Sequence, residues 1–245
     1  MKTKSTFVLL FLFIVCSCST FNVGNDEAAK ISKDNLVLYL PFSGSIDDES
    51  KIDNQFQLVG VSLSDDRHGK INSACLFNGI DNHLVIKDSD FLFPSNNKLS
   101  ISLWAKIAYP GNKFLLYKGS SLYDREYALG INEDSLFTFQ INHNGSSTER
   151  SAINSGTVIK EDEWYHLVGT WDGKVQKLYL NGSLVNIDYP NISIGNFNSA
   201  LYIGSFGGSI KQYAFKGVID DLLIYNRVLN EKEVQVLYKY DINFK

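Results

Sequence analysis

Cysteine is scarce in this sequence, and its placement leaves no pair for a disulfide within the folded domain. Of three cysteines in 245 residues, Cys16 and Cys18 lie in the N-terminal segment and only Cys75 lies further along. A small scaffold held together by disulfides is therefore excluded. Cys75 occurs in a strand-like run over residues 73–77, so we expect it to be a buried, small apolar side chain.

Proline, methionine and helical periodicity are also sparse. The chain has 4 Pro and one Met, while 13 Tyr, 16 Phe and 18 Gly are typical of short strands joined by glycine turns. No apolar period of helical length appears before the C-terminus, so we predict an all-β fold, an antiparallel two-sheet β-sandwich or jelly roll. The expected strands lie in residues 36–42, 55–59, 74–77, 83–86, 99–107, 113–117, 126–131, 136–141, 164–185, 201–203 and 217–225.

Basic side chains are not in excess. The chain has 23 Lys and Arg against 27 Asp and Glu. Removal of residues 1–17 would take away Lys2 and Lys4 and no acid, leaving 21 basic against 27 acidic residues, a net charge of −6. Nucleic-acid binding needs a basic stripe, so we expect no nucleic-acid partner.

Signatures of catalysis are missing. No pair of histidines has the spacing of a zinc site, and neither a G-x-S-x-G nor a P-loop motif occurs. His166 lies on a strand and is expected to be a buried or inter-strand residue. Glycoside hydrolysis needs two carboxylates that flank the scissile bond. Asp220 and Asp221 are adjacent and should point to opposite faces of a strand, while Glu161 and Glu163 lie in a loop, so we predict no enzyme.

The N-terminus has the pattern of a targeting segment. Lys2 and Lys4 precede the apolar run 7–15, which is too short to span a bilayer, and Cys16-Ser17-Cys18 follows. This pattern resembles a bacterial lipobox, with residues 1–17 as the signal peptide and Cys18 as the lipidated residue; an ordinary signal peptide is the alternative. Residues 18–35 then form a flexible tether to the cell envelope, and Ser19 after the cysteine resembles outer-membrane sorting.

Residues 164–185 are the strongest structural signal. Asp172-Gly173 and Asn181-Gly182 accept positive φ at two-residue hairpin turns, so this stretch predicts a three-stranded meander. Alternation places Tyr165, Leu167 and Trp171 on one face of the first strand and His166, Val168 and Thr170 on the other.

The same stretch carries a family resemblance. The motif W-x-H-L-V-x-T-W-D-G followed by L-Y-L-N-G is similar to the signature of laminin-G-like jelly-roll domains in the concanavalin A-like lectin/glucanase superfamily. Residues 75–86, 99–106 and 217–229 resemble further blocks of that family, as do Phe42, Gly44 and Asp48 in the first loop. The resemblance implies one jelly-roll domain over residues 36–245.

A calcium ion is implied by the resemblance. In many members a cation ties the opening loop to the closing strand, and the matching positions here are Asp48 and Asp220. Calcium takes carboxylate and carbonyl oxygens as ligands. The alternative is that Asp220 accepts hydrogen bonds from loop amides with no metal bound.

A short helix is predicted at the C-terminus. Asn230 and Glu233 are spaced as a capping box, and Leu229 and Val234 as a hydrophobic staple. Val234, Leu237 and Tyr238 form one apolar stripe, which predicts a structural lid on the sandwich.

Non-catalytic carbohydrate binding, at loops or the concave face, is the function that the resemblance implies. Aromatic rings hold sugars through their C–H faces, and the loop aromatics available are Tyr109, Tyr123, Phe206 and Tyr213. The stretch 204–213 is the most site-like of these loops, with an ordinary long connection as its alternative. The expected partner is a polysaccharide or glycan, or else a protein of the cell surface.

Overall fold

The computed structural model describes residues 30–87, 90–121, 124–143, 149–207 and 211–244. The signal segment, Cys18 and Tyr123 lie outside the described residues. Within them, no helix is both long enough and apolar enough to cross a membrane.

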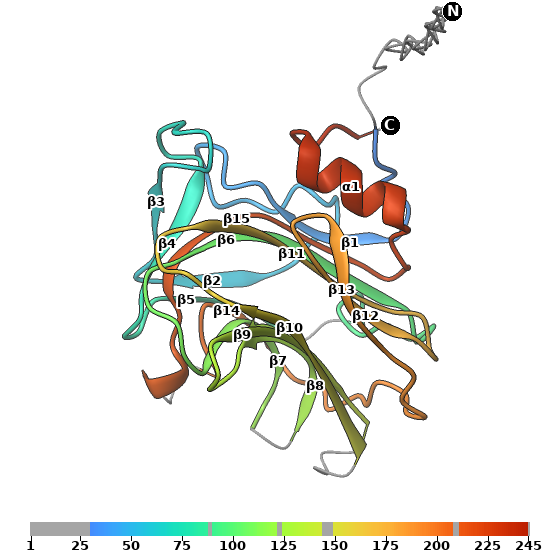
Figure 1. Ribbon diagram of the computed structural model, residues 1–245. Coiled ribbons are helices and arrows are strands. Elements are labelled where there is room, and N and C mark those ends of the chain that lie inside the picture. Colours follow the sequence, from blue (N-terminus) through green and yellow to red (C-terminus); the bar gives the residue numbers. More distant parts are fainter. Residues whose placement is uncertain (1–29, 88–89, 122–123, 144–148, 208–210, 245) are drawn as a thin grey trace, which may run out of the picture.

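Two antiparallel sheets stack face to face and form a β-sandwich, as predicted (Figure 1). The larger sheet has the order β13-β12-β11-β6-β15-β4-β3, with β1 also pairing with β15, and the smaller has the order β10-β9-β8-β7-β14-β5-β2. The strands are β1 (Leu36–Leu40), β2 (Phe56–Val59), β3 (Ser62–Ser64), β4 (Ala74–Asn78), β5 (His83–Ile86), β6 (Leu99–Ile107), β7 (Lys113–Gly119), β8 (Arg125–Ile131), β9 (Leu136–Asn142), β10 (Arg150–Val158), β11 (Trp164–Trp171), β12 (Gln176–Leu180), β13 (Ser183–Asp188), β14 (Leu201–Ile203) and β15 (Lys216–Tyr225).

The predicted strands are confirmed, with boundary shifts of up to three residues. Two strands were not predicted. Strand β3 has three residues, too few to show alternation, and β10 has the polar, glycine-containing sequence RSAINSGTV. Both are ordered by pairing with β4 and β9 rather than by their own propensity.

The meander has the predicted alternation. Tyr165, Leu167 and Trp171 of β11 belong to the core between the sheets, whereas Val168 belongs to a separate cluster on the outer face. Asn181 and Gly182 have φ of 48° and 76°, as the predicted turn requires. Cys75 is buried in the same core, as expected.

Helix α1 (Glu231–Lys239) covers part of the outer face of the larger sheet (Figure 1). Its capping box is confirmed, because the Asn230 side chain accepts from the backbone N–H groups of Lys232 and Glu233, and Glu233 accepts from the N–H of Asn230. Val234 and Leu237 pack in one cluster with side chains of β1, β11, β12 and β15.

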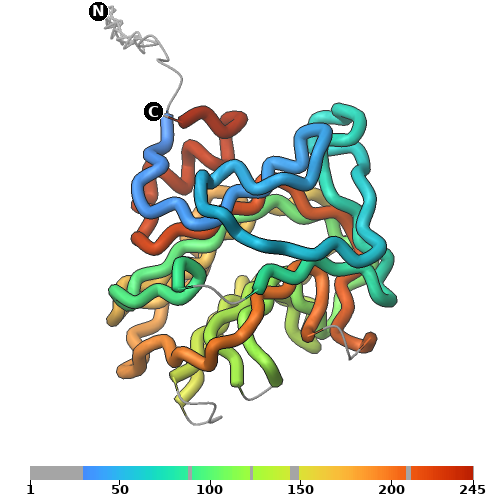
Figure 2. Tube along the Cα trace, turned by 180° about the vertical axis from the view of Figure 1, so that it is seen from behind, coloured from blue at the N-terminus to red at the C-terminus, as the bar shows by residue number. Residues whose placement is uncertain are grey.

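The two described ends of the chain lie side by side next to the helix. Figure 2 shows the start of the chain (blue) running beside its C-terminal end (red). A bridge between Ile31 and Phe244 joins them, and Tyr39 of β1 packs edge-on against Phe244 at 5.2 Å between ring centroids. The chain after α1 is therefore held at the edge of the covered face, beside the uncovered part of the sheet.

Candidate functional site

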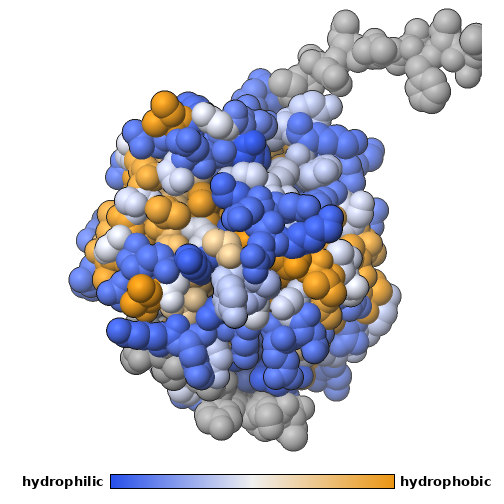
Figure 3. Space-filling model, turned by 60° about the vertical axis from the view of Figure 1, so that its left-hand side comes forward, coloured by the Kyte–Doolittle hydropathy of each residue, from blue (hydrophilic) through white to orange (hydrophobic). Residues whose placement is uncertain are grey.

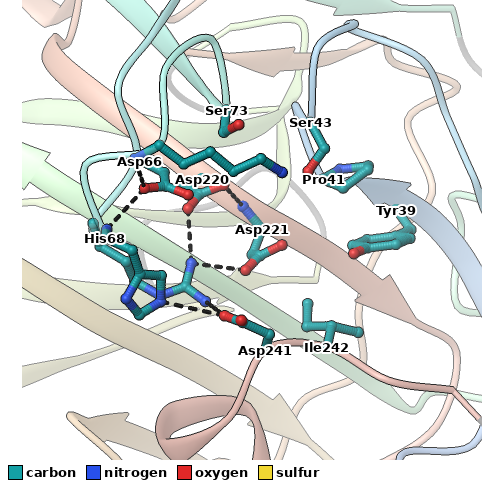
Figure 4. A pocket seen from close by; sticks show the side chains of 12 residues that line it. Tyr39, Pro41, Ser43, Asp66, His68, Ser73, Asp220, Asp221, Asp241 and Ile242 are labelled. Carbon is teal, nitrogen blue, oxygen red and sulfur yellow. Dashed lines mark hydrogen bonds and ion pairs between the residues drawn. The ribbon is translucent and has the colours of Figure 1, made fainter.

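A cleft opens where α1 stops covering the larger sheet. It consists of two adjoining hollows of about 270 and 470 Å³, and Arg67, His68 and Asp241 line both of them. Figure 4 shows the smaller hollow, in which the loop before β4, strand β15 and the segment after α1 meet. One face of the molecule, turned 60° from the view of Figure 1, mixes hydrophilic and hydrophobic residues at its surface (Figure 3).

Arg67 is the centre of the cleft. Its Nη1 donates to Oδ2 of Asp220 at 2.7 Å and to Oδ2 of Asp221 at 2.8 Å, and its Nη2 donates to Oδ1 of Asp241 at 3.2 Å. The guanidinium also lies over the ring of Trp104, 4.8 Å from the centroid. Charge-assisted hydrogen bonds of this kind are the strong ones in proteins, so Arg67 fixes three segments relative to one another.

The prediction that Asp220 and Asp221 point to opposite faces is wrong. The register between β15 and β6 shifts between Asp220 and Leu223, and Asp221 has a φ of 45°. The extra residue is a β-bulge, which breaks the alternation and turns both carboxylates towards Arg67. The sequence showed no glycine at this point that would have signalled the bulge.

Burial shapes the titration of the two aspartates. Burial, with a further contribution from the charge of Asp221, raises the pKa of Asp220 to about 8, although Arg67 acts in the opposite direction. Burial likewise raises the pKa of Asp221, again opposed by Arg67. A single guanidinium thus only partly compensates two buried carboxylates.

The residues present do not fit the calcium ion that the family resemblance implies. Oδ1 of Asp48 accepts from the N–H groups of Tyr39 and Ser50, and its Oδ2 accepts from Ser50 Oγ and from Asn54 Nδ2 at 2.6 Å. Asp220 is already bound to Arg67. In the described part of the chain no group of three or more His, Cys, Asp or Glu side chains suits a metal ion. Calcium at Asp48 and Asp220 remains an untested prediction.

Aromatic side chains line the larger hollow. Trp104 of β6, Trp164 of β11 and Tyr238 of α1 contribute to it, together with Tyr240 and Lys239. The Trp104 and Tyr238 rings stack at 5.7 Å with an interplanar angle of 20°. Sequence reasoning gave Tyr238 a purely structural role and did not single out Arg67 or Trp104. The alternation of β6, whose inner face is apolar, indicates that Trp104 lies on the outer face.

His166 lies beneath the rings of Trp104 and Tyr238. It is 1% exposed, its Nε2 is 3.0 Å from Ser102 Oγ, and its ring is 5.1 Å from that of Trp104. Burial, with a smaller contribution from the positive charge of Arg67, lowers its pKa to about 3. The predicted buried, inter-strand role is confirmed.

Of the predicted loop aromatics, the three that the structure describes do not come together as one exposed site. Phe206 and Tyr213 meet on the outer face of the smaller sheet, but Phe206 is only 5% exposed and packs against Tyr117 at 4.6 Å. Its ring supports the connection between β14 and β15, so the expectation that it faces a ligand is not met. Tyr213 is partly exposed, and Tyr109 is 61% exposed on another loop.

A known protein family matches most of the described chain. Residues 78–235 match the family model described as the concanavalin A-like lectin/glucanases superfamily. The chain belongs to this superfamily. A comparison with curated proteins finds no match.

Solved structures share the superfamily's jelly roll. Domain 4 of AbnA, a GH43 extracellular arabinanase from Geobacillus stearothermophilus in complex with arabinotriose, aligns with a TM-score of 0.67 at 20% identity, covering 84% of this chain and 98% of that one. The binding domain of Paraclostridial Mosquitocidal Protein 1 aligns at 0.64 and 21% identity, covering 84% and 52%. The binding domain of botulinum neurotoxin DC in complex with rat synaptotagmin II aligns at 0.65 and 17%, covering 84% and 52%. The chain spans about half the length of these toxin domains.

Proposed function

We propose that this domain is a non-catalytic carbohydrate-binding module whose ligand lies in the cleft around Arg67. The observation that carries the proposal is the composition of the larger hollow. Its lining combines the rings of Trp104, Trp164 and Tyr238 with the charged groups of Arg67 and Asp241.

This composition suits a sugar better than an apolar ligand. The C–H faces of a pyranose or furanose pack on aromatic rings, while its hydroxyl groups donate to carboxylates and accept from a guanidinium. Asp241 is 83% exposed at its side chain, so one of its oxygens is available for a ligand. The arabinotriose complex of the structurally similar arabinanase domain supports a glycan ligand for this fold.

Hydrolysis is disfavoured by the position of the acids. A glycosidase needs two carboxylates on either side of the scissile bond. The side chains of Asp220 and Asp221 are only 3% and 14% exposed, and both bind the same nitrogen of Arg67. Such carboxylates stabilise a guanidinium rather than act on a ligand.

A glycan array followed by isothermal titration calorimetry tests the proposal. Trp164→Ala should weaken binding of the best glycan about tenfold, because one stacking surface is lost. Tyr213→Ala, on the other sheet, is the matched control and should bind as the wild type. The recovered glycan should be uncleaved.

Four outcomes would contradict the proposal. If no glycan on the array is bound, the domain is not a carbohydrate-binding module. If the glycan is cleaved, the domain is an enzyme. Weaker binding in Tyr213→Ala but not in Trp164→Ala would move the site to the loop over the smaller sheet. Capture of an envelope protein in place of a glycan would favour the alternative of an adhesion module, for which the synaptotagmin complex of the similar toxin domain is a precedent.

We also propose that the protein is anchored to the bacterial envelope, at the outer membrane, through a lipidated Cys18. The lipobox-like sequence before Cys18 supports this location. Labelling of cells with a radioactive fatty acid should mark the wild type and not Cys18→Ala. Equal labelling of both, or of neither, would contradict the anchor.

A further inference from the structure

The contacts of Arg67 point to a built-in cation. We propose that the Arg67 guanidinium takes the position of a divalent ion between the closing strand and the end of the chain, so that the fold requires no calcium. This inference does not depend on which ligand the cleft binds.

Arg67 joins segments that are far apart in the chain. Asp220 and Asp221 belong to β15, whereas Asp241 follows α1, and Arg67 comes from the loop between β3 and β4. One guanidinium reaches all three carboxylates, at 2.7, 2.8 and 3.2 Å. A bridging metal ion joins segments in the same way, with oxygens converging on a central positive charge.

The side chains of Arg67 and Asp220 are both buried. The Arg67 side chain is only 8% exposed, and that of Asp220 is 3% exposed. Buried carboxylates need a compensating charge, and a guanidinium keeps its charge at every physiological pH. Unlike a bound ion, it cannot be withdrawn by a chelator.

Strand β15 has an unusual backbone conformation at Asp221. Asp221 adopts a φ of 45°, a left-handed conformation that costs energy for any residue with a Cβ. This conformation occurs at the bulge that turns both carboxylates towards Arg67. The strained backbone of Asp221 is thus needed for both carboxylates to pair with one cation.

Asp48, the residue of the opening loop that the resemblance assigns to the ion, is engaged within its own loop. Both carboxylate oxygens of Asp48 accept hydrogen bonds from Tyr39, Ser50 and Asn54. The loop is therefore closed by its own polar groups. Arg67 compensates the charge of Asp220 and Asp221 on β15.

Thermal unfolding of the wild type in EDTA and in millimolar CaCl₂ tests the proposal directly. The two midpoints should agree, and titration of Ca²⁺ into the wild type should release no binding heat. A midpoint that rises with Ca²⁺ or falls with EDTA would overturn the proposal. This part of the test needs no variant.

Variants of Arg67 test the role of the guanidinium. Arg67→Asn leaves the carboxylates unpaired and should lower the midpoint by on the order of 10 °C. Ca²⁺ should then restore part of the loss, whereas KCl at the same ionic strength should not. Arg67→Lys keeps the charge but not the planar fork, so its loss should be intermediate.

Arg227→Gln is the matched control, because Arg227 also pairs with a carboxylate, that of Glu233 at 2.8 Å, but outside the aspartate cluster. Its midpoint should fall less than that of Arg67→Asn and should not respond to Ca²⁺. Equal losses in the two variants would contradict the special role of Arg67. An Arg67→Asn protein that Ca²⁺ stabilises no more than KCl would show that the guanidinium does not fill a cation position.

Discussion

His166 shows at the residue scale how a polar group is kept neutral inside this sandwich. It lies on the outer face of β11, beneath Trp104 and Tyr238, and its only hydrogen-bond partner among the described side chains is Ser102. Burial disfavours a positive charge on His166, and the nearby guanidinium of Arg67 disfavours it further. Protonation of His166 therefore opposes the folded state.

We predict a stability loss in acid that depends on His166. Its pKa is about 3 when folded and near 6.5 when unfolded, so the unfolded chain binds more protons between these values. The contribution of His166 to stability is complete above pH 6.5 and falls by up to about 1.4 kcal/mol per pH unit below it. Denaturant unfolding at several pH values measures this slope.

His166→Gln provides the comparison. It should lose less free energy of unfolding than the wild type between pH 6.5 and pH 4.5, and the partly exposed His83→Gln should behave as the wild type. Asp220 acts with the opposite sign, because its raised pKa favours the folded state at lower pH, but it contributes equally in all three proteins. Parallel slopes in the wild type and His166→Gln would rule out the neutral, buried histidine.

At the scale of elements, the connections are held by side chains of the strands. Lys118 at the end of β7 pairs with Glu126 of β8 at 3.2 Å, and both side chains are fully buried. Glu126 also accepts from the N–H groups of Phe197 and Ser199, and Lys118 donates to the carbonyl of Ser199. Burial raises the pKa of Glu126, partly offset by Lys118. This pair therefore fastens the long connection before β14 to the smaller sheet.

Removing one member of the Lys118–Glu126 pair should lower the free energy of unfolding more than removing both. Lys118→Met leaves a buried carboxylate without its partner and should lower the free energy of unfolding by roughly 3–5 kcal/mol. The double variant Lys118→Met with Glu126→Leu should recover part of that loss, since neither member of the pair is left charged without its partner, although the N–H groups of Phe197 and Ser199 lose their acceptor. Urea unfolding of the two variants measures the difference, and a double variant no more stable than Lys118→Met would contradict the explanation.

The whole molecule divides into features that local sequence encodes and features that arise from tertiary contacts. Alternation and turn residues predicted the strands, the meander, the capping box and the sandwich, because each depends on the chemistry of a few neighbouring residues. The strands β3 and β10 and the β15 bulge were not predicted. They depend on pairing with distant segments, and the bulge reverses the alternation from which the direction of Asp221 was inferred.

The all-β sandwich could be inferred from the sequence alone, since hydrophobic periodicity and hairpin turns are local properties, and short motifs carried the resemblance to the superfamily. The positions of the candidate site residues depend instead on tertiary contacts. Arg67 is more than 150 residues from Asp220 and Asp221 and 174 from Asp241, and no spacing rule connects positions so far apart. Their meeting follows from the pairing of β4 with β15 in the larger sheet and from the return of the chain after α1, which also places Tyr238 beside Trp104.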